Sequence, residues 1–424
     1  MNTPKIRFKG FKDDWEQRKL GDVLICLQNN TFSRADLSNE TGVAKNVHYG
    51  DVLVKFGEVL DVSKEQLPMI SDERVLIKYK ASFLQNGDVI VADTAEDSTV
   101  GKCSEIAGLN NEIVLSGLHT IPYRPKEKFA SGYLGYYLNS DSYHNQLIPL
   151  MQGIKVTSIS KSALRNTDII YPESKEEQAK IGNYFQSLDN LITLHQRKCD
   201  ETKQLKKFML QKMFPKNGEK NPEIRFEGFT DDWEQRKLSE ICERITRKNR
   251  NNESDLPLTI ASQFGLIDQR DFFNKVVAAK DMSNYYLLKK GEFAYNKSYS
   301  NGFDYGSIKR LNAYKQGCLS TLYICFGITS DEVESDYLEC FFDTLKWYGD
   351  LSMICAEGAR NHGLLNVDTK GFFDEVTVDL PKSLEEQKRI SVYMNALNRL
   401  ITLHQRKCEK LKELKKFMLQ NMFV

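Results

Sequence analysis

The sequence lacks the features of a membrane protein, of a secreted protein and of a strongly charged protein. Its 424 residues contain no apolar run long enough to cross a bilayer, and the first ten, MNTPKIRFKG, lack the apolar core of a secretion signal. Its nine cysteines form no CxxC pair, so we expect reduced, structural cysteines in a cytoplasmic protein. A net charge of only +1 excludes a globally basic protein, so any nucleic-acid surface must be local.

Sequence signatures of catalysis are also missing. There is no GxxxxGK[ST] phosphate loop, no GxGxxG fingerprint, no HExxH and no Cys/His cluster with metal-ligand spacing. The NPEI sequence at 221–224 is not the NPP-aromatic motif of an adenine methyltransferase. We therefore expect a chain without catalytic residues, metal or cofactor of its own.

The sequence does contain an internal repeat. RFKGFKDDWEQRKL at 7–20 returns as RFEGFTDDWEQRKL at 225–238, with twelve of the fourteen residues identical. We call these two segments the openers. The segments that follow them, 21–171 and 239–380, show no similarity by eye. The chain thus repeats its openers, whereas the segments that follow them differ.

A second repeated block closes each half. PESKEEQAKI begins at 172 and returns as PKSLEEQKRI at 381, and LITLHQRKC is identical at 191–199 and 400–408. Both blocks end in LKKFMLQ, three residues before a final Phe. The stretch 215–222, PKNGEKNP, has two prolines and a glycine and is typical of a linker.

The closing blocks predict two long helices. Ser174 and Ser383 precede Glu177 and Glu386 by three residues, which is the spacing of a capping box. Apolar residues then recur at steps of three and four over about 40 residues, a heptad-like seam. Since such a helix cannot bury its seam alone, we expect the two copies to pack antiparallel. The alternative is two independent helices, each packed on its own variable segment.

The variable segments are typical of β-rich, mixed α/β domains. Alternating residues predict strands at 51–60 and 87–93, followed by a short amphipathic helix at 132–147. The second segment has the same order, with strands within 291–300 and 317–328 and a helix at 337–351. We expect one fold with two diverged surfaces.

Polar loops in these segments are candidates for DNA contact. They are 93–102 and 151–165 in the first segment, and 244–252, 296–310 and 355–365 in the second. Their Lys, Arg, Asn and Ser side chains include phosphate donors and readers of base edges. Solvated surface loops are the alternative for any one of them.

The two DDWEQRKL openers, the two variable segments and the two LITLHQRK…LKKFMLQ helices together resemble the specificity subunit of type I restriction–modification enzymes (HsdS-like). The resemblance covers essentially the whole chain. It implies an α+β protein with two mixed α/β target recognition domains, separated by two long antiparallel coiled-coil helices, in an internal pseudo-twofold repeat. The expected parts are a first domain at 1–171, a first helix at 172–214, a linker at 215–223, a second domain at 224–380 and a second helix at 381–424.

The resemblance also implies a function. Each target recognition domain would read one half of a bipartite, asymmetric site in double-stranded DNA. The helices would dock two methyltransferase (modification) subunits and, through them, two restriction (motor-nuclease) subunits, for adenine methylation or restriction. S-adenosylmethionine, ATP and Mg would belong to these partners. Two other hypotheses are a non-catalytic coiled-coil adaptor presenting two β-rich protein-binding domains, and an enzyme with two diverged active sites.

Contact residues are assigned only by position in the loops and helices. The expected DNA-binding residues are Lys155, Thr157, Ser158, Lys161, Asn296, Lys297, Tyr299, Asn301, Lys309, Arg310, Arg360 and Asn361. The expected partner-binding helix residues are Leu188, Leu191, Leu205, Met209, Leu397, Leu400, Leu414 and Met418.

Overall fold

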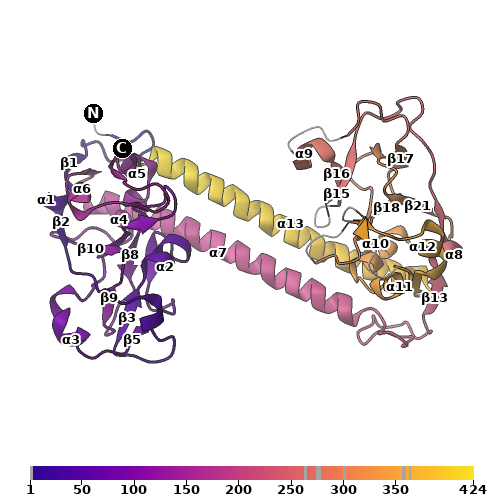
Figure 1. The fold of residues 1–424 in the computed structure, drawn as a ribbon, viewed down its shortest axis with the longest axis horizontal. Helices are drawn as coiled ribbons and strands as arrows, with labels where there is room; N and C mark the ends of the chain where they lie inside the picture. The colour runs from indigo at the N-terminus through magenta and orange to yellow at the C-terminus, as the bar shows by residue number, and fades with distance from the viewer. Residues whose placement is uncertain (1–2, 262–264, 274–277, 299–301, 356–359, 362–363) are drawn as a thin grey trace. The chain divides into compact units, whose positions relative to one another are not determined.

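The chain folds into two compact units that share two long helices. The computed structural model describes residues 3–261, 265–273, 278–298, 302–355, 360–361 and 364–424. The first unit consists of 1–196 and 405–424, and the second of 197–404. The helices α7 (Lys175–Lys212) and α13 (Leu384–Asn421) each run without a break for 38 residues (Figure 1). Both predicted helices are confirmed, whereas the predicted domain boundaries stay a prediction.

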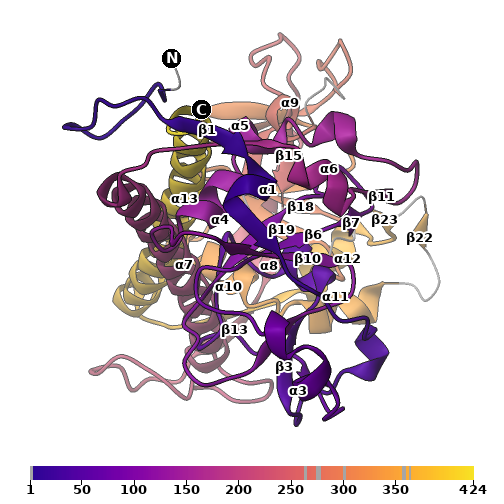
Figure 2. The ribbon, with the colours of Figure 1, turned by 90° about the vertical axis from the view of Figure 1, so that its left-hand side faces the viewer.

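The first unit is built from short strands and helices around one main sheet. Its strands are β1 Glu16–Lys19, β2 Leu24–Cys26, β3 Ala44–Val47, β4 Val59–Asp61, β5 Met69–Ile70, β6 Val89–Ala92, β7 Thr94–Ala95, β8 Cys103–Ala107, β9 Val114–Ser116, β10 Thr120–Pro125, β11 Thr157–Ser158 and β12 Asp168–Tyr171. Its helices, besides α7, are α1 Leu20–Val23, α2 Tyr49–Val54, α3 Val75–Lys78, α4 Tyr133–Leu138, α5 Asp141–His144 and α6 Lys161–Arg165. The sheet order is β2-β10-β6-β8-β4, and β5-β3-β9 form a separate sheet at the end of the unit opposite β1 (Figure 1). Figure 2 shows β3 at that end of the unit and β1 at the other.

The second unit has the same kind of content. Its strands are β13 Glu234–Lys237, β14 Cys242–Arg244, β15 Leu258–Ala261, β16 Gly265–Asp268, β17 Tyr286–Lys289, β18 Phe293–Asn296, β19 Ser307–Arg310, β20 Gln316–Leu319, β21 Ile324–Ile328, β22 Arg360–Asn361, β23 Leu364–Leu365 and β24 Thr377–Leu380. Its helices, besides α13, are α8 Leu238–Ile241, α9 Gln269–Phe273, α10 Ser335–Asp343, α11 Tyr348–Ile354 and α12 Thr369–Glu375.

Both units contain the same four-stranded antiparallel sheet, although their sequences differ there. The order β2-β10-β6-β8 in the first unit corresponds to β14-β21-β18-β19 in the second. The registers agree as well: Tyr123 faces Cys26 and Val89, and Phe326 faces Arg244 and Phe293. The expectation of one fold for both variable segments is confirmed.

The prediction of a strand over 51–60 is wrong for its first half. Residues Tyr49–Val54 form α2, because the His48 ring accepts a hydrogen bond from Gly50 N at 3.2 Å and caps the helix start. Only Val59–Asp61 form a strand, β4. The alternation of apolar residues there fits both periods over so short a run.

The two long helices contact each other in both units. In the first unit Asp189 of α7 pairs with Lys415 of α13 at 2.7 Å, and Gln196 lies 3.7 Å from Cys408. In the second unit Cys199 Sγ lies 3.9 Å from the Ile401 carbonyl oxygen. In the first unit residue numbers rise along one helix as they fall along the other, so the predicted antiparallel packing is confirmed there.

The last residue of each repeated block fills an aromatic core. Phe423 is 4% exposed and lies 6.5 Å from the ring of Trp15 and 5.7 Å from that of Phe185. In the second unit Phe214 lies 6.0 Å from the ring of Trp233. Both tryptophans are buried, as packing residues are. The openers and the helix ends are therefore repeated because they pack against each other.

A buried ion pair joins each opener to the start of a long helix. Arg7 Nε lies 2.6 Å from Glu177 Oε1, and Arg225 Nε lies 2.7 Å from Glu386 Oε1. Both glutamates are at most 2% exposed. The serines do cap the helices, but the glutamates of the expected capping boxes bind these arginines.

The glutamine that follows each of these glutamates ties the helix to the rest of its unit. Gln178 donates to the Pro172 carbonyl oxygen and accepts from Ala130 N. Gln387 donates to the Pro381 carbonyl oxygen and accepts from Glu334 N. The repeated Glu-Gln pair thus has a structural explanation in both units.

Glu105 gives the first unit a pH dependence that can be measured. The side chain is 2% exposed and accepts from Gly132 N and Gly135 N at the start of α4. Burial raises its pKa from 4.5 to about 7, against the pull of these backbone donors. The pKa of Glu105 is higher in the folded chain than in the unfolded chain, so the folded state favours the protonated side chain. Its contribution to the free energy of unfolding is therefore complete below pH 4.5 and is lost as the pH rises to about 7. We expect the free energy of unfolding to fall by about 3 kcal/mol over this range.

Urea unfolding followed from pH 4 to pH 8 measures this loss. Glu105→Gln removes the titrating group and should flatten the profile across the same range. An equally steep profile in that variant would assign the pH dependence to another group.

Candidate nucleic-acid interface

In the first unit the two predicted loops meet at a short antiparallel pairing. Strand β7 follows the end of β6, and its Thr94 and Ala95 pair with Ser158 and Thr157 of β11. Ile159 N also donates to the Asp93 carbonyl oxygen at 2.9 Å. Thr157 and Ser158 therefore lie beside the end of the main sheet. The sheet gives the loop that carries them a rigid support.

Lys155 lies at the tip of a tight hairpin. Gln152 and Ser158 exchange two backbone hydrogen bonds of 2.9 and 2.8 Å, which close the loop. Gly153 has a φ of 115°, and a Cβ there would lie 1.9 Å from the Val156 carbonyl oxygen, so only glycine fits. Lys155 and its neighbour Ile154 are exposed. The hairpin holds a cation and an apolar side chain out into solvent.

Three further residues gather near this junction that the sequence did not single out. Lys161 Nζ donates to Asn29 Oδ1 at 3.3 Å. His119 lies 3.3 Å from Asp93 Oδ1 and 5.3 Å, between ring centroids, from Tyr49. Asn29, Tyr49 and His119 come from distant parts of the chain, so no local motif could have connected them. Only the positive φ of His119, 54°, marks it as unusual.

The second unit repeats this junction with different side chains. Leu365 N donates to the Lys297 carbonyl oxygen at 3.0 Å, so the loop after β18 again meets the later loop. Asn296 accepts from Ser298 N at 3.0 Å, and the side chains of Asn296 and Lys297 are half-buried. Arg360 and Asn361 form β22, which pairs with β23. Tyr299 and Asn301 lie outside the described residues.

Lys309 and Arg310 do not lie free for DNA contact, which departs from the expectation. Lys309 Nζ lies 2.8 Å from Asp343, and its side chain is 14% exposed. Arg310 pairs with Asp336 and with Glu339, the latter at 2.9 Å, and is 12% exposed. Burial raises the pKa of Asp343, but Lys309 and Lys206 outweigh it and hold the value at about 2. These two cations stabilise the second unit by binding carboxylates of α10.

The strand registers explain why Arg310 is structural. Arg310 faces Phe293 in the second unit as Glu105 faces Val89 in the first, so the two occupy the same place in the shared sheet. Glu105 binds the start of α4, and Arg310 binds Ser335 and Asp336 at the start of α10. The same sheet position therefore binds the start of the following helix in both units, with a glutamate in the first unit and an arginine in the second.

The basic run at 244–252 is also largely engaged within the protein. Arg247 lies 2.6 Å from Glu292, and Lys248 Nζ lies 3.9 Å from the centroid of the Tyr286 ring. Arg244 donates to the hydroxyl of the same tyrosine at 3.2 Å. Arg250 at the end of the run is exposed.

The expected partner-binding residues of the helices divide into three groups. Leu188 and Leu397 are 5% and 6% exposed and belong to the cores of their units, which corrects their assignment to a partner surface. Met209 and Met418 are half-buried against the same cores. The exposed members are Leu191, Leu205, Leu400 and Leu414, with exposed fractions of 41–45%.

Phe208 and Phe417, which the sequence did not single out, extend this exposed group. They are 47% and 53% exposed and lie three residues beyond Leu205 and Leu414. Each unit therefore carries the same three exposed apolar residues. They are Leu191, Leu414 and Phe417 in the first unit, and Leu400, Leu205 and Phe208 in the second. We call each set an apolar ridge.

The described residues contain no arrangement that calls for a metal or a bilayer. No group of three or more His, Cys, Asp or Glu side chains in them is placed to hold a metal ion. None of the helices in this part of the chain is long and apolar enough to span a membrane.

Known proteins resemble this chain in sequence and in fold. The family model described as Type I restriction modification DNA specificity domain matches residues 12–204. A Methanocaldococcus jannaschii protein carrying the name of a type I restriction enzyme MjaX specificity subunit is 25% identical over 222 residues. That match covers 51% of this chain and 49% of the relative, so the chain spans about half of the relative's length.

The S subunit of a type I restriction–modification system from M. genitalium has a similar crystal structure. Its TM-score is 0.62 at 14% identity, covering 100% of this chain and 99% of that one, which shows a common fold. The matched stretch 12–204 includes the first loop junction and most of α7, up to residue 204. Residues 12–204 of the chain are therefore similar to type I restriction modification DNA specificity domains.

Proposed function

We propose that this chain is the DNA-specificity subunit of a type I restriction–modification complex. Each unit reads one half of a bipartite, asymmetric site in double-stranded DNA. The observation that carries the proposal is that the two units repeat their openers and long helices but have different loop junctions. The openers and helices bind each other by the same contacts in both units, whereas the side chains at the junctions differ.

The difference between the junctions supports the reading of two different half-sites. The first presents Lys155 on a closed hairpin with Thr157, Ser158 and Lys161 beside it. The second presents Asn296 and Lys297 at the end of β18, next to the strand that carries Arg360 and Asn361. Lysine and arginine pair with phosphate or guanine, and asparagine with adenine. Tyr299 and Asn301 remain candidates in the same loop.

The apolar ridges support the docking of two copies of one partner. Each unit carries the same Leu-Leu-Phe set, with exposed fractions of 41–53% in the first and 43–47% in the second. Repeated apolar side chains at the surface are typical of protein interfaces. We assign both ridges to methyltransferase (modification) subunits, through which two restriction (motor-nuclease) subunits join.

Chemistry belongs to the partners in this proposal. The methyltransferase subunits would bring S-adenosylmethionine and methylate one adenine in each half-site, and the motor-nuclease subunits would bring ATP and Mg. This chain contributes recognition and spacing in the cytoplasm and no catalytic residue.

Co-expression with a type I methyltransferase subunit in a host without DNA methylation tests the proposal. Single-molecule sequencing should find one split motif with one modified adenine per half, on opposite strands. If the two proteins are soluble and associated but no adenine is modified, the DNA-reading role is contradicted. A coiled-coil adaptor that presents two protein-binding domains would then be the better account.

A further inference from the structure

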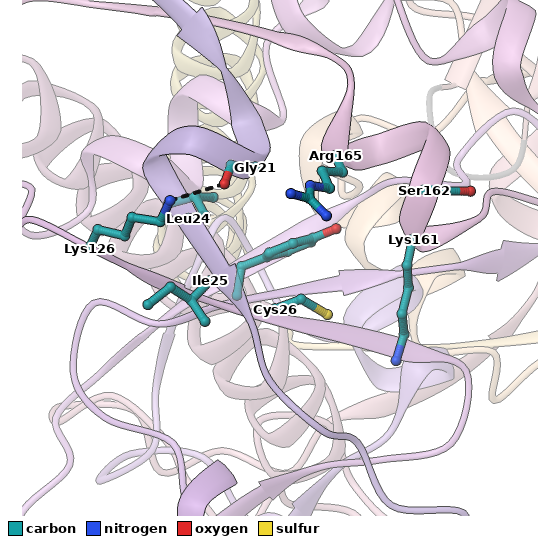
Figure 3. Close-up of a pocket in the computed structure, with 9 residues that line it drawn as sticks. Gly21, Leu24, Ile25, Cys26, Lys126, Lys161, Ser162 and Arg165 are labelled. Atoms are coloured by element: carbon teal, nitrogen blue, oxygen red, sulfur yellow. Dashed lines mark hydrogen bonds between the residues drawn. The ribbon is translucent and has the colours of Figure 1, made fainter.

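The first unit contains a pocket lined by apolar and cationic side chains. It has a volume of about 480 Å³ and lies between α1, the ends of β2 and β10, and α6 (Figure 3). This volume is within the range of pockets that bind small molecules. We call it the first-unit pocket.

Three cations surround its mouth. Figure 3 shows Lys126 on one side and Lys161 and Arg165, both from α6, on the other. Lys126 donates to the Gly21 carbonyl oxygen at 3.2 Å, and Lys161 donates to Asn29, so both have neutral acceptors. No ion pair between described residues involves any of the three. Their combined charge is therefore available to an anion.

One wall of the pocket is formed by Leu24, Ile25 and Tyr123. Leu24 is 2% exposed, and Ile25 adds an aliphatic side chain that is 48% exposed. Tyr123 is 2% exposed, and its hydroxyl has no hydrogen-bond partner among the residues that the structure describes. Burial raises the pKa of this hydroxyl well above its usual value, so it remains a hydrogen-bond donor. A buried, unsatisfied hydroxyl next to a cavity is costly unless a ligand completes it.

The equivalent positions of the second unit carry different residues. Phe326 takes the place of Tyr123 in the register and so lacks the hydroxyl. The ring of Phe373, from the helix before the last strand, lies 6.1 Å from that of Phe326. Gly21 is replaced by Ser239, whereas a Cβ at Gly21 would lie 2.3 Å from Arg165 Cγ. The second unit therefore does not repeat the tyrosine hydroxyl or the glycine of the first-unit pocket.

We propose that the first-unit pocket binds a single nucleotide. The phosphate pairs with the three cations, and the base lies against Leu24 and Ile25, where a ring nitrogen or carbonyl oxygen accepts from the Tyr123 hydroxyl. Strong anion binding, an apolar wall and one polar contact within a small volume are together what a nucleotide requires. The nucleotide is either free or part of a DNA strand. The DNA source rests on the proposed function, and the free nucleotide does not.

Cys26 provides a direct reporter because it lines the pocket and is the exposed member of the nine cysteines. The rate at which a maleimide modifies Cys26 in the full chain is measured by peptide mass spectrometry. The probes are dTMP, dAMP, inorganic phosphate and a duplex bearing the methylated motif. Cys355, a half-buried cysteine of the second unit, is the internal control.

We expect at least a fivefold slower modification of Cys26 with one of the mononucleotides or with the duplex, and no change at Cys355. Protection by mononucleotides identifies a free nucleotide as the ligand, and protection by the duplex alone identifies a nucleotide of the strand. Equal protection by inorganic phosphate would overturn the proposal in favour of a simple anion site. No protection by any probe would also overturn it. If the duplex binds and is methylated normally in that case, the proposed function stands while the pocket assignment fails.

Two variants separate ligand binding from folding. Tyr123→Phe copies the second unit and removes only an unsatisfied hydroxyl, so its melting temperature should be unchanged or higher. The probe concentration for half-protection should rise about five- to tenfold, since a hydrogen bond is lost. Arg165→Gln should raise it at least tenfold. Unchanged protection in both variants would contradict the contacts assigned here.

Discussion

A chain carrying Leu205→Glu and Phe208→Glu is expected to bind one methyltransferase subunit where the unchanged chain binds two. These side chains form most of the ridge of the second unit and are 43% and 47% exposed. A carboxylate buried without a partner at an interface costs several kcal/mol, so we expect the affinity at that ridge to fall by about 100-fold or more. Native mass spectrometry of the co-purified complex gives the stoichiometry.

The repeat supplies matched variants for this experiment. Leu414→Glu with Phe417→Glu should remove the partner of the first unit in the same way, and the fourfold variant should bind none. Lys203→Glu and Lys412→Glu change charge at exposed positions of the same helices outside the ridges and should leave two partners bound. If the fourfold variant is folded and still binds two methyltransferase subunits, the ridges are not the docking surface.

Breaking the ion pair between opener and helix should destabilise either unit strongly. Arg225→Met leaves Glu386, which is 2% exposed, without its guanidinium, although Trp233 Nε1 still donates to it at 3.3 Å. We expect a loss of about 3 kcal/mol, at the lower end for a broken buried pair. Arg7→Met should cost more, about 4 kcal/mol, because the buried Trp15 Nε1 has no hydrogen-bond partner in the described part of the chain and so gives Glu177 no such support.

Urea unfolding of the single variants and of Arg225→Met/Glu386→Met measures both effects. The double variant removes the stranded charge, and its stability should return to within about 1 kcal/mol of the unchanged chain. If Arg225→Met and the double variant are equally destabilised, the cost arises from lost packing of the arginine stem, and the ion-pair account is wrong.

The openers and the long helices could be predicted from the sequence because both are repeated in it. Identical residues at 191–199 and 400–408 and the uninterrupted spacing of apolar residues predicted two long helices, and both formed as 38 residues. Their antiparallel packing followed from the need to bury a seam. The four-stranded sheet in the variable segments was predicted only as a strand order, since no residue identity connects the two copies.

Side-chain partners brought from a distance could not be predicted. Glu177 has the spacing of a capping residue, yet it binds Arg7, 170 positions earlier. Lys309 and Arg310 look like DNA ligands in a polar loop, but carboxylates of α10 neutralise them. Leu188 and Leu191 look alike in a heptad pattern, and only packing decides that the first is buried and the second exposed. Charge and spacing alone do not reveal which neighbours the fold supplies.

The central claim is that a constant framework carries two independent readers. It is tested most directly by replacing residues 239–380 with a second copy of 21–171. The ends of the exchanged segments match, because β13 pairs with β24 in the same register as β1 pairs with β12. Glu234 faces Leu380, and Glu16 faces Tyr171. With a methyltransferase partner present, adenine mapping by single-molecule sequencing should give a symmetric motif in which the first half-site occurs twice as an inverted repeat. An unchanged asymmetric motif, from a chimera shown to be folded and partner-bound, would contradict the claim.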